Sequence, residues 1–527
     1  MVYLKMVNLT IDGKSIQVPE GTTILDAAES LGIKIPTLCF VKDLLPLTSC
    51  MLCVVRVEGR RNLLPACATR AEEGMVVKND DPDVTSARRT ALELLLSDHA
   101  GDCMGPCQAA CPAGMDIPGM IRCMTDGNYD RAIEIIKEHI ALPAVTGYIC
   151  PAPCEKACRR GQVDDSISVR LIKRCAAEMD LSKASPWKPA VIPDCDKKVA
   201  IIGAGPAGLS AACYLQRDGV SCTVFDDRED PGGMLRYGVT EAELPRPVLD
   251  AEIEQIRSLG VLFRQQVRIG RDITLDELLK LFDAVFMGIG KANAGDLEML
   301  GFTHNKGILK VDPDTMQTDI PGVFAGGDVR KGLKLTARSL GDGKKAAAGI
   351  IQFLNNMPVT GPEKLFNTRM GKPEPDELAQ FRISEPEDSR DRQMDTDRAL
   401  DPEQASHESG YCLHCDCRKD SSCKLRIYAG EYGAKATRYR GKRRAFIRRE
   451  EHPDVIYEPG KCISCGICVK ITEKQREKLG LTFIGRGFDV KVAVPFDKSI
   501  ADGLLKTARK AVALCPTGAL AFKVDKD

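Results

Sequence analysis

The chain has 527 residues, long enough for roughly three or four domains of ordinary size, each with its own hydrophobic core. Its 74 Lys and Arg residues balance 74 Asp and Glu residues, so no global charge points to nucleic acid or an anionic membrane. The first residues alternate like a strand pair, without a signal-peptide pattern, and no apolar run reaches membrane-spanning length. We therefore expect a cytoplasmic protein with no targeting segment.

The 23 cysteines indicate metal ligation before disulfide bonding, because no secretion signal is evident. Eighteen of them fall into short, regularly spaced groups. The other five stand alone, and we interpret them as small buried apolar residues: Cys123, Cys175, Cys195, Cys213 and Cys222.

Residues 1–80 are predicted to form a β-grasp domain, with a hairpin over Val7–Val18 and a helix that starts near Ile24. Four cysteines follow the pattern C-x10-C-x2-C-x13-C: Cys39, Cys50, Cys53 and Cys67. Thiolates suit iron, and this spacing lets a loop surround a compact cluster. The pattern resembles the 2Fe-2S domain that begins the large iron-sulfur subunit of complex I and iron-only hydrogenases. A structural zinc site is the alternative.

Residues 81–195 are predicted to be helical, beginning with an apolar stripe of leucines in Ala87–His99. Seven candidate ligands follow: His99, Cys103, Cys107, Cys111, Cys150, Cys154 and Cys158. The phrases PCQAACP and CPAPCEKAC resemble the cluster domain shared by the glutamate synthase small subunit and dihydropyrimidine dehydrogenase. That resemblance implies two 4Fe-4S clusters. One would be held by Cys103, Cys107 and Cys158, and the other by Cys111, Cys150 and Cys154.

Two positions depart from that family. His99 stands where the family has its first cysteine, and LLLSDHAGDC resembles the histidine-ligated cluster of complex I, so we expect His99 to ligate iron; a surface or core histidine is the alternative. Lys173 stands where the family offers Glu or Gln, and a protonated amine cannot ligate iron. Cys175 lies about 200° further round a helix and replaces it only if the register slips. The sequence thus provides 19 grouped ligands, one short of five four-ligand clusters.

Residues 196–358 are predicted to form a Rossmann-like FAD domain, because a strand, a glycine-rich turn and a helix follow one another over Lys197–Gln216. The glycines permit close backbone approach, the helix N-terminus faces a pyrophosphate, and Asp226 can bind a ribose. The later phrases DPGGMLRYGV and TDIPGVFAGGDV resemble FAD-binding proteins, in which the residue matching Asp328 holds the ribityl chain. The predicted binding residues are Gly203, Gly205, Pro206, Ala207, Gly208, Asp226, Gly232, Gly233, Gly327 and Asp328.

Glutamate synthase small subunits carry an NAD(P)H-binding domain between the two halves of the FAD domain. Here Phe282–Gly295 is followed by FAGGDV after a short connection. A single βαβ unit needs about 30 residues or more, so we expect the nicotinamide domain to be missing.

Residues 359–410 are rich in Pro, Glu, Asp and Arg and are predicted to be a surface linker. The last predicted domain, 411–527, has a local set at Cys412, Cys415, Cys417 and Cys423, for which zinc is the alternative. A second set, Cys462, Cys465, Cys468 and Cys515, resembles a 4Fe-4S module of the complex I large subunit. Eight Lys or Arg residues between Lys435 and Arg449 form either a solvated face or a docking patch.

The predicted fold class is therefore multidomain α/β and α+β: a β-grasp 2Fe-2S ferredoxin, a helical double-cluster domain, a Rossmann-like FAD domain and a C-terminal Cys-rich ferredoxin-like domain. We expect FAD, one 2Fe-2S cluster and three to four 4Fe-4S clusters, with no catalytic residue, in an electron-transfer subunit of a larger oxidoreductase. Its partners would be redox subunits: a complex I-like NADH/FMN subunit, a hydrogenase, or a formate or aldehyde dehydrogenase, with ferredoxin as a further partner. The alternatives are an NADPH-dependent glutamate synthase-type reductase subunit and a redox-sensing scaffold.

Overall fold

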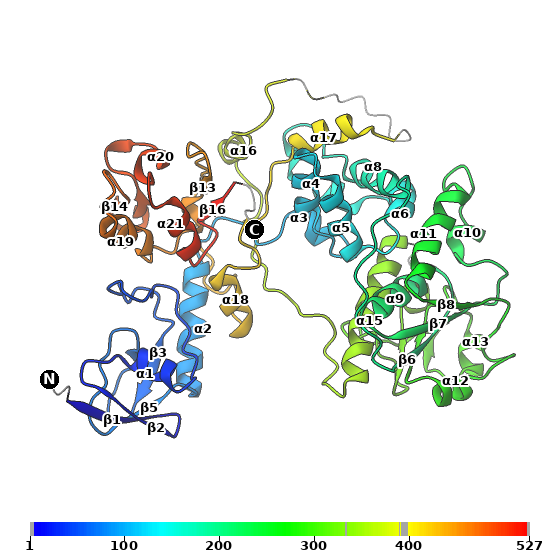
Figure 1. The fold of residues 1–527 in the computed structure, drawn as a ribbon, viewed down its shortest axis with the longest axis horizontal. Helices are drawn as coiled ribbons and strands as arrows, with labels where there is room; N and C mark the ends of the chain where they lie inside the picture. Colours follow the sequence, from blue (N-terminus) through cyan, green and yellow to red (C-terminus); the bar gives the residue numbers. More distant parts are fainter. Residues whose placement is uncertain (1–4, 333–334, 389, 391–398, 524–527) are drawn as a thin grey trace. The chain divides into compact units, whose positions relative to one another are not determined.

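The computed structural model describes residues 5–332, 335–388, 390 and 399–523, so part of the predicted linker lies outside the described residues. The chain divides into two compact units. Unit 1 combines Met1–Met104, Lys364–Ser384 and Cys415–Asp527, and unit 2 combines Gly105–Glu363 and Glu385–His414. Unit 2 is therefore an insertion in the sequence of unit 1, which takes the blue and red ends of the chain in Figure 1.

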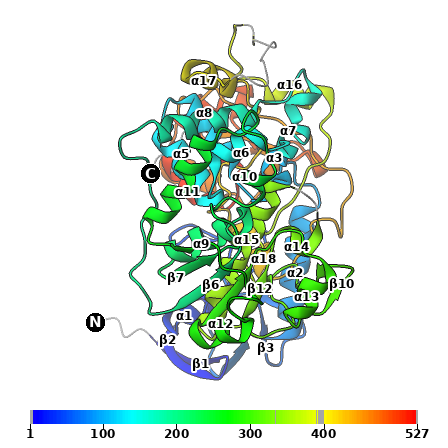
Figure 2. The ribbon, with the colours of Figure 1, turned by 90° about the vertical axis from the view of Figure 1, so that its right-hand side faces the viewer.

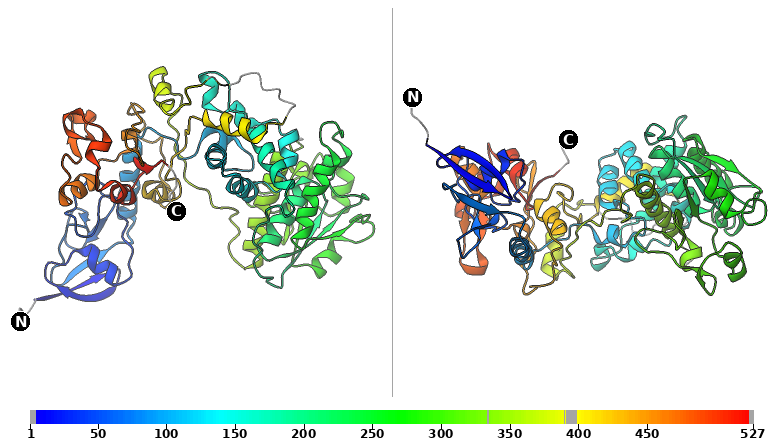
Figure 3. Two further views of the ribbon diagram at one scale, coloured as in Figure 1. Left: turned by 45° about the horizontal axis from the view of Figure 1, so that its top comes forward. Right: turned by 90° about the horizontal axis from the view of Figure 1, so that it is seen from below.

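The N-terminal part of unit 1 is a five-stranded sheet in the order β2-β1-β5-β3-β4, with one helix, α1 (Figures 1 and 3). The hairpin forms where it was predicted, because Asp12 and Gly13 both adopt positive φ in its turn. Strand β1 pairs in parallel with β5, and the other pairs are antiparallel. The elements are β1 (Met6–Ile11), β2 (Lys14–Pro19), α1 (Ile24–Ser30), β3 (Val54–Val57), β4 (Leu64–Pro65) and β5 (Met75–Lys78).

The rest of unit 1 is built from short helices and strand pairs around the long helix α2 (Pro82–Leu96), which begins at the Asp81 cap. Its other elements are α16 (Pro375–Phe381), α18 (Lys424–Glu431), β13 (Val455–Tyr457), η2 (Pro459–Lys461), α19 (Ile467–Lys474), β14 (Thr482–Ile484), η3 (Gly487–Asp489), β15 (Lys491–Ala493), η4 (Pro495–Asp497), α20 (Ile500–Gly503), α21 (Ala508–Leu514) and β16 (Leu520–Phe522). Helix α18 packs against α2, and β13 pairs with β16.

Residues 359–410 were predicted to be a surface linker, but the part that forms α16 is packed into unit 1. The buried Glu377 carboxylate accepts a hydrogen bond from the Phe446 amide at 2.7 Å and pairs with Arg443. The Phe381 ring stacks on Phe446 with centroids 3.8 Å apart. Five of the basic residues between Lys435 and Arg449 likewise have carboxylate partners: Arg438 with Glu93, Arg443 with Glu377, Arg444 with Asp98, Arg448 with Glu458, and Arg449 with Glu451. These five arginines are paired within unit 1 and do not form a free docking patch.

The first part of unit 2 is helical, and α17 (Pro402–Gly410) returns to pack against α4 and α8. The helices are α3 (Pro106–Ala110), α4 (Ile117–Thr125), α5 (Tyr129–His139), α6 (Pro143–Ile149), α7 (Pro153–Lys156), η1 (Arg159–Gln162) and α8 (Val169–Leu181). The end of the predicted linker is thus a structural part of the helical layer.

The second part of unit 2 is a five-stranded parallel sheet in the order β12-β9-β6-β7-β8, with α9 and α15 packed together beside it (Figure 2). The elements are β6 (Lys198–Ile202), α9 (Pro206–Arg217), β7 (Ser221–Phe225), α10 (Met234–Tyr237), α11 (Arg246–Ser258), β8 (Leu262–Arg264), α12 (Leu275–Leu281), β9 (Ala284–Met287), α13 (Ala294–Met299), β10 (His304–Asn305), β11 (Ile308–Leu309), β12 (Val323–Ala325), α14 (Asp328–Lys331) and α15 (Thr336–Leu354). The described residues between β9 and β12 form only α13 and the hairpin β10–β11.

Candidate cluster and nucleotide sites

The four cysteines of the first predicted set are buried at one edge of the β-grasp sheet. Cys39, Cys50 and Cys53 lie between α1 and β3, and Cys67 follows β4. The sulfurs of Cys39 and Cys50 are 3.3 Å apart. Buried thiols gathered in this way suit a compact cluster, because soft sulfur ligands prefer iron and an apolar shell limits solvent access.

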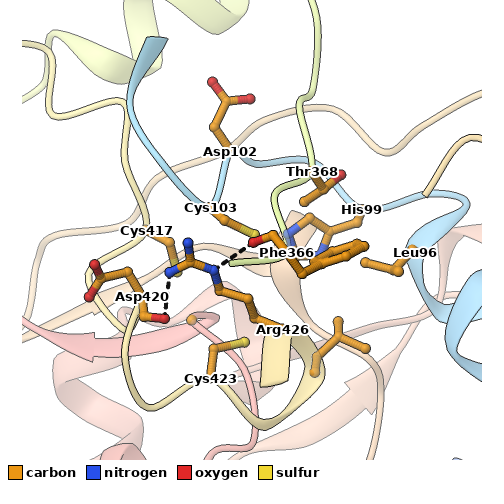
Figure 4. Close-up of a pocket in the computed structure, with 12 residues that line it drawn as sticks. Leu96, His99, Asp102, Cys103, Phe366, Thr368, Cys417, Asp420, Cys423 and Arg426 are labelled. Atoms are coloured by element: carbon orange, nitrogen blue, oxygen red, sulfur yellow. Dashed lines mark hydrogen bonds between the residues drawn. The ribbon is translucent and has the colours of Figure 1, made fainter. Parts of the chain in front are cut away.

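A second group of ligands meets in a pocket of unit 1 that encloses about 340 Å³ (Figure 4). Its lining includes His99, Cys103, Cys417 and Cys423. His99 and Cys103 follow α2, Cys423 precedes α18, and the Cys417 amide donates to the Cys103 carbonyl at 3.4 Å. We call this the composite pocket, because its ligands come from both sides of the inserted unit 2.

This grouping differs from the predicted ligand sets. Cys103 was expected beside Cys107 and Cys158, and Cys417 and Cys423 were expected to share one local set with Cys412 and Cys415. The physical reason is that unit 2 is inserted as two segments, Gly105–Glu363 and Glu385–His414. The fold of unit 1 brings Cys103 beside Cys417 and Cys423 in spite of this separation in sequence.

The lining of the composite pocket includes one buried guanidinium, that of Arg426. Arg426 is buried, and it donates to the carbonyls of Phe366 and Asp420, each at 2.7 Å. Its Nη2 has no hydrogen-bond partner among the described residues. Lys461 is fully buried beside Glu458. Burial, with a contribution from Lys461, lowers the pKa of His99 to about 4, so its imidazole is neutral and its nitrogens can act as ligands.

Gly518 completes the wall of this pocket. A Cβ atom at this position would lie 2.2 Å from the Cys417 sulfur, so only glycine leaves room for that side chain. Sequence reasoning missed both Gly518 and Arg426. The signal for Gly518 was its position in the CPTGAL phrase, whereas Arg426 had no signal beyond its place three residues after Cys423.

The last predicted set also lines one pocket, which encloses about 370 Å³ in unit 1. Its cysteines are Cys462, Cys465, Cys468 and Cys515. Burial raises the pKa of Cys462 to about 11 and that of Cys465 to about 12. Such thiols stay neutral unless a metal stabilises the thiolate form. The segment that holds Cys515 continues to Gly518, so it lines both this pocket and the composite pocket.

The three sites of unit 1 share one hydrophobic core. Its buried members include at least one cysteine from each site: Cys39, Cys50, Cys423 and Cys465. The leucines and isoleucines between them are Leu38, Leu52, Leu92, Leu96, Leu425, Ile467 and Ile471. A continuous apolar medium of this kind excludes water between neighbouring sites.

In unit 2, Cys111 and Cys150 both act electrostatically on the pKa of the Cys154 thiol, which shows that the three cysteines lie near one another. Lys173 is buried, and its ammonium donates to the Thr146 hydroxyl at 2.8 Å. The Cys175 sulfur is 3.9 Å from the Met179 sulfur. The Lys173 side chain, expected at the fourth ligand position, is therefore buried and bonded to Thr146, and Cys175 contacts Met179.

The remaining grouped cysteines of unit 2 are Cys107, Cys158 and Cys412. All three are half-buried and pack against the hydrophobic core of unit 2. Cys415 is the first residue after unit 2. Of the lone cysteines, Cys175, Cys213 and Cys222 are buried, as predicted. The interpretation is wrong for Cys195, which is exposed, and Cys123 is half-buried.

The glycine-rich phrases of unit 2 converge at the N-terminus of α9. A Cβ atom at Gly203 would lie 2.5 Å from the Gly288 carbonyl oxygen, and one at Gly233 would lie 2.8 Å from Gly205 Cα. A Cβ atom at Gly327 would lie 3.1 Å from the Ala207 Cβ. These close approaches explain the glycines and leave the first amides of α9, where Pro206–Gly208 lie, facing a phosphate site.

Asp226 ends β7 and is buried beside this loop. Its carboxylate accepts hydrogen bonds from the Ala204 amide at 2.6 Å and the Arg228 amide at 2.9 Å, and burial raises its pKa. The Gly232 amide donates to the Ala204 carbonyl at 2.9 Å. Asp328 begins α14 directly after Gly327. The two carboxylates and the close backbone contacts at the glycines together fit a dinucleotide.

Three regions match known family models. Residues 4–82 match the 2Fe-2S iron-sulfur cluster binding domain. Residues 97–185 match the 4Fe-4S cluster domain II of dihydropyrimidine dehydrogenase, and residues 201–255 match an NAD(P)-binding Rossmann-like domain. Among the described residues, no helix is both long and apolar enough to cross a bilayer.

The chain is also similar to curated oxidoreductase subunits. It is 40% identical over 210 residues to the NADPH-Fe(3+) oxidoreductase subunit beta of Geobacter sulfurreducens, covering 39% of this chain and 31% of the relative. It is 40% identical over 206 residues to the NADP(+)-dependent formate dehydrogenase subunit beta of Moorella thermoacetica, covering 35% and 29%. It is 33% identical over 264 residues to the NAD-dependent dihydropyrimidine dehydrogenase subunit PreT of Escherichia coli, covering 47% and 63%.

The chain spans about a third of the first two relatives and less than two thirds of the third. The predicted resemblance to the glutamate synthase and dihydropyrimidine dehydrogenase group is confirmed. The protein is a multidomain α/β chain with 2Fe-2S and 4Fe-4S ferredoxin domains and a Rossmann-like nucleotide-binding domain, and its homologues are electron-transfer subunits of oxidoreductases.

Proposed function

We propose that the chain is an FAD- and iron-sulfur-containing electron-transfer subunit of a multi-subunit oxidoreductase. The observation that carries the proposal is one apolar core of unit 1 that contains cysteines from three separate ligand sets. Iron-sulfur clusters exchange electrons one at a time, and closely spaced sites in a dry interior suit a relay.

In unit 1 the proposed ligands form three sets. Cys39, Cys50, Cys53 and Cys67 hold the 2Fe-2S cluster. His99, Cys103, Cys417 and Cys423 hold a 4Fe-4S cluster in the composite pocket, and Cys462, Cys465, Cys468 and Cys515 hold another. The neutral imidazole of His99 removes one negative charge relative to a thiolate, and the buried Arg426 adds positive charge. Both effects favour the reduced form of the composite site.

In unit 2 the proposed cofactor of the α9 loop is FAD, which accepts two electrons and releases them singly. Pro206, Ala207 and Gly208 present the start of α9 to the pyrophosphate, and Asp226 and Asp328 provide carboxylates for the ribose and ribityl hydroxyls.

Helix α15 connects this loop to the cluster ligands of unit 2. A Cβ at Gly343 would lie 2.3 Å from the Ala207 carbonyl oxygen, and one at Gly341 would lie 2.5 Å from the carbonyl oxygen of Pro112, the neighbour of Cys111. One helix therefore packs tightly on both sites. This packing supports transfer between the flavin and the site of Cys111, Cys150 and Cys154.

The short connection between β9 and β12 supports a role as an intermediary, because it leaves no room for a second dinucleotide-binding unit among the described residues. We propose that a partner subunit binds the nicotinamide or other substrate. The named activities of the relatives, NADPH-Fe(3+) reduction and formate oxidation, indicate the kinds of partner to examine.

The test is anaerobic purification followed by cofactor analysis and EPR spectroscopy of the dithionite-reduced chain. We expect one FAD and about 14 to 18 iron atoms per chain, with distinct signals from 2Fe-2S and 4Fe-4S clusters. His99→Ala should remove or shift one 4Fe-4S signal, while Cys195→Ser, at an exposed lone cysteine, should leave every signal unchanged. Purified protein without iron, or with zinc in its place, would overturn the proposal.

A further inference from the structure

The end of unit 2 is held against the segment that contains Cys158. The buried Arg160, two residues after Cys158, donates to the carbonyl of Tyr411 at 3.1 Å. The same guanidinium lies over the Tyr411 ring, 5.5 Å from its centroid. Tyr411 precedes Cys412, so these contacts hold the segment of Cys412 within reach of the Arg160 side chain, two residues from Cys158.

Further contacts anchor the helix before Cys412. Glu408 in α17 is fully buried, and its carboxylate accepts a hydrogen bond from the Ser168 amide at 2.8 Å, at the start of α8. Arg390 pairs with Glu408 at 2.6 Å and donates to the Ser166 carbonyl at 2.8 Å. The segment that carries Cys412 is therefore packed into the helical layer of unit 2.

Cys107 belongs to the same neighbourhood. It lies in α3, which packs against α7, and the chain leaves α7 directly into Cys158, whose amide donates to the Glu155 carbonyl at 3.0 Å. Cys107, Cys158 and Cys412 pack on one core. Cys417 and Cys423, by contrast, line the composite pocket of unit 1.

We propose that Cys107, Cys158 and Cys412 are ligands of one 4Fe-4S cluster in unit 2. The inference rests on the proposed cluster-binding function and sharpens it. Cys412 then serves a cluster in unit 2, whereas Cys417 lines the composite pocket of unit 1, so cysteines five residues apart serve two different clusters.

Iron counts of paired variants of the full, anaerobically purified chain test this assignment. Two substitutions in one cluster should remove about four iron atoms, whereas substitutions in two clusters should remove about eight. We expect Cys158→Ser with Cys412→Ser to lose no more iron than either single variant. Cys412→Ser with Cys417→Ser should lose about twice as much as either. Cys195→Ser is the matched control.

The opposite pattern, with Cys412 and Cys417 non-additive and Cys158 and Cys412 additive, would overturn the assignment but leave the cluster-binding function intact. A wild-type chain without iron would instead overturn the function.

A second measurement needs no variant. A chelator is added to the native chain, and newly exposed thiols are alkylated and identified by mass spectrometry over time. We expect Cys107, Cys158 and Cys412 to become labelled together, and Cys103, Cys417 and Cys423 to follow a separate time course. Labelling of Cys412 in step with Cys417 and Cys423 would overturn the assignment.

Discussion

Arg426 is expected to raise the reduction potential of the composite site. The guanidinium is buried, donates to two carbonyls with Nε and Nη1, and leaves Nη2 without a partner among the described residues. A fixed positive charge beside a cluster stabilises the form with one more electron. Replacing Arg426 with Met should therefore lower the potential of this cluster.

The position of Arg426 sets the size of the effect. Arg426 lines the composite pocket together with Cys417 and Cys423, so its guanidinium lies on the order of 6 Å from the cluster centre. At an effective dielectric constant of about 20, two unit charges at about 6 Å interact by about 3 kcal/mol. For a one-electron couple this corresponds to a shift of about 0.1 V.

The assay is an EPR-monitored redox titration of the wild-type chain, Arg426→Met and Arg426→Lys. We expect the histidine-ligated signal to shift by about −0.1 V in Arg426→Met and by much less in Arg426→Lys, which keeps the charge. The other two clusters of unit 1 serve as internal references. An unchanged potential in Arg426→Met with full iron occupancy would refute the electrostatic argument.

Three further changes test other parts of the structure. Gly518→Ala should abolish the composite-site EPR signal, because its Cβ would lie 2.2 Å from the Cys417 sulfur, whereas Gly441→Ala, with nothing within 4 Å, should leave it intact. Lys173→Gln should make the cluster of Cys111, Cys150 and Cys154 more resistant to chelators, because an amide oxygen can ligate iron; Lys173→Met should not. Burial raises the pKa of Glu252 to about 7 from 4.5, so the stability it provides is fully present at low pH and is lost as pH rises through about 7. The expected loss is about 3 kcal/mol, and the melting temperature of Glu252→Gln should depend less on pH than that of the wild-type chain.

Sequence patterns predicted the elements whose formation depends on residues close together in the chain. The Asp12-Gly13 hairpin, the leucine stripe of α2 and the strand-turn-helix at Gly203 all form where the pattern placed them. The glycines of the nucleotide loop were also predictable, because close backbone contact between neighbouring segments requires them.

Ligand partners were less predictable, because spacing rules assume that nearby cysteines serve one site. Here the inserted unit 2 separates Cys103 from Cys417, and the returning chain changes units between Cys412 and Cys417. Even with the two inserted segments removed, residues 364–384 stand between Cys103 and Cys417, so sequence spacing does not reveal that these cysteines meet. The charged linker was misjudged for a related reason, because the carboxylates of Glu377 and Glu408 are buried against arginines that lie far away in the sequence.

The central claim is that the chain relays electrons through FAD and several clusters and leaves nicotinamide binding to a partner. The most direct test is anaerobic stopped-flow mixing of the purified chain with NADPH or NADH while the flavin absorbance is followed. We expect neither to bleach the flavin, whereas dithionite reduces the flavin and the clusters. Rapid bleaching by NADPH or NADH would contradict the claim.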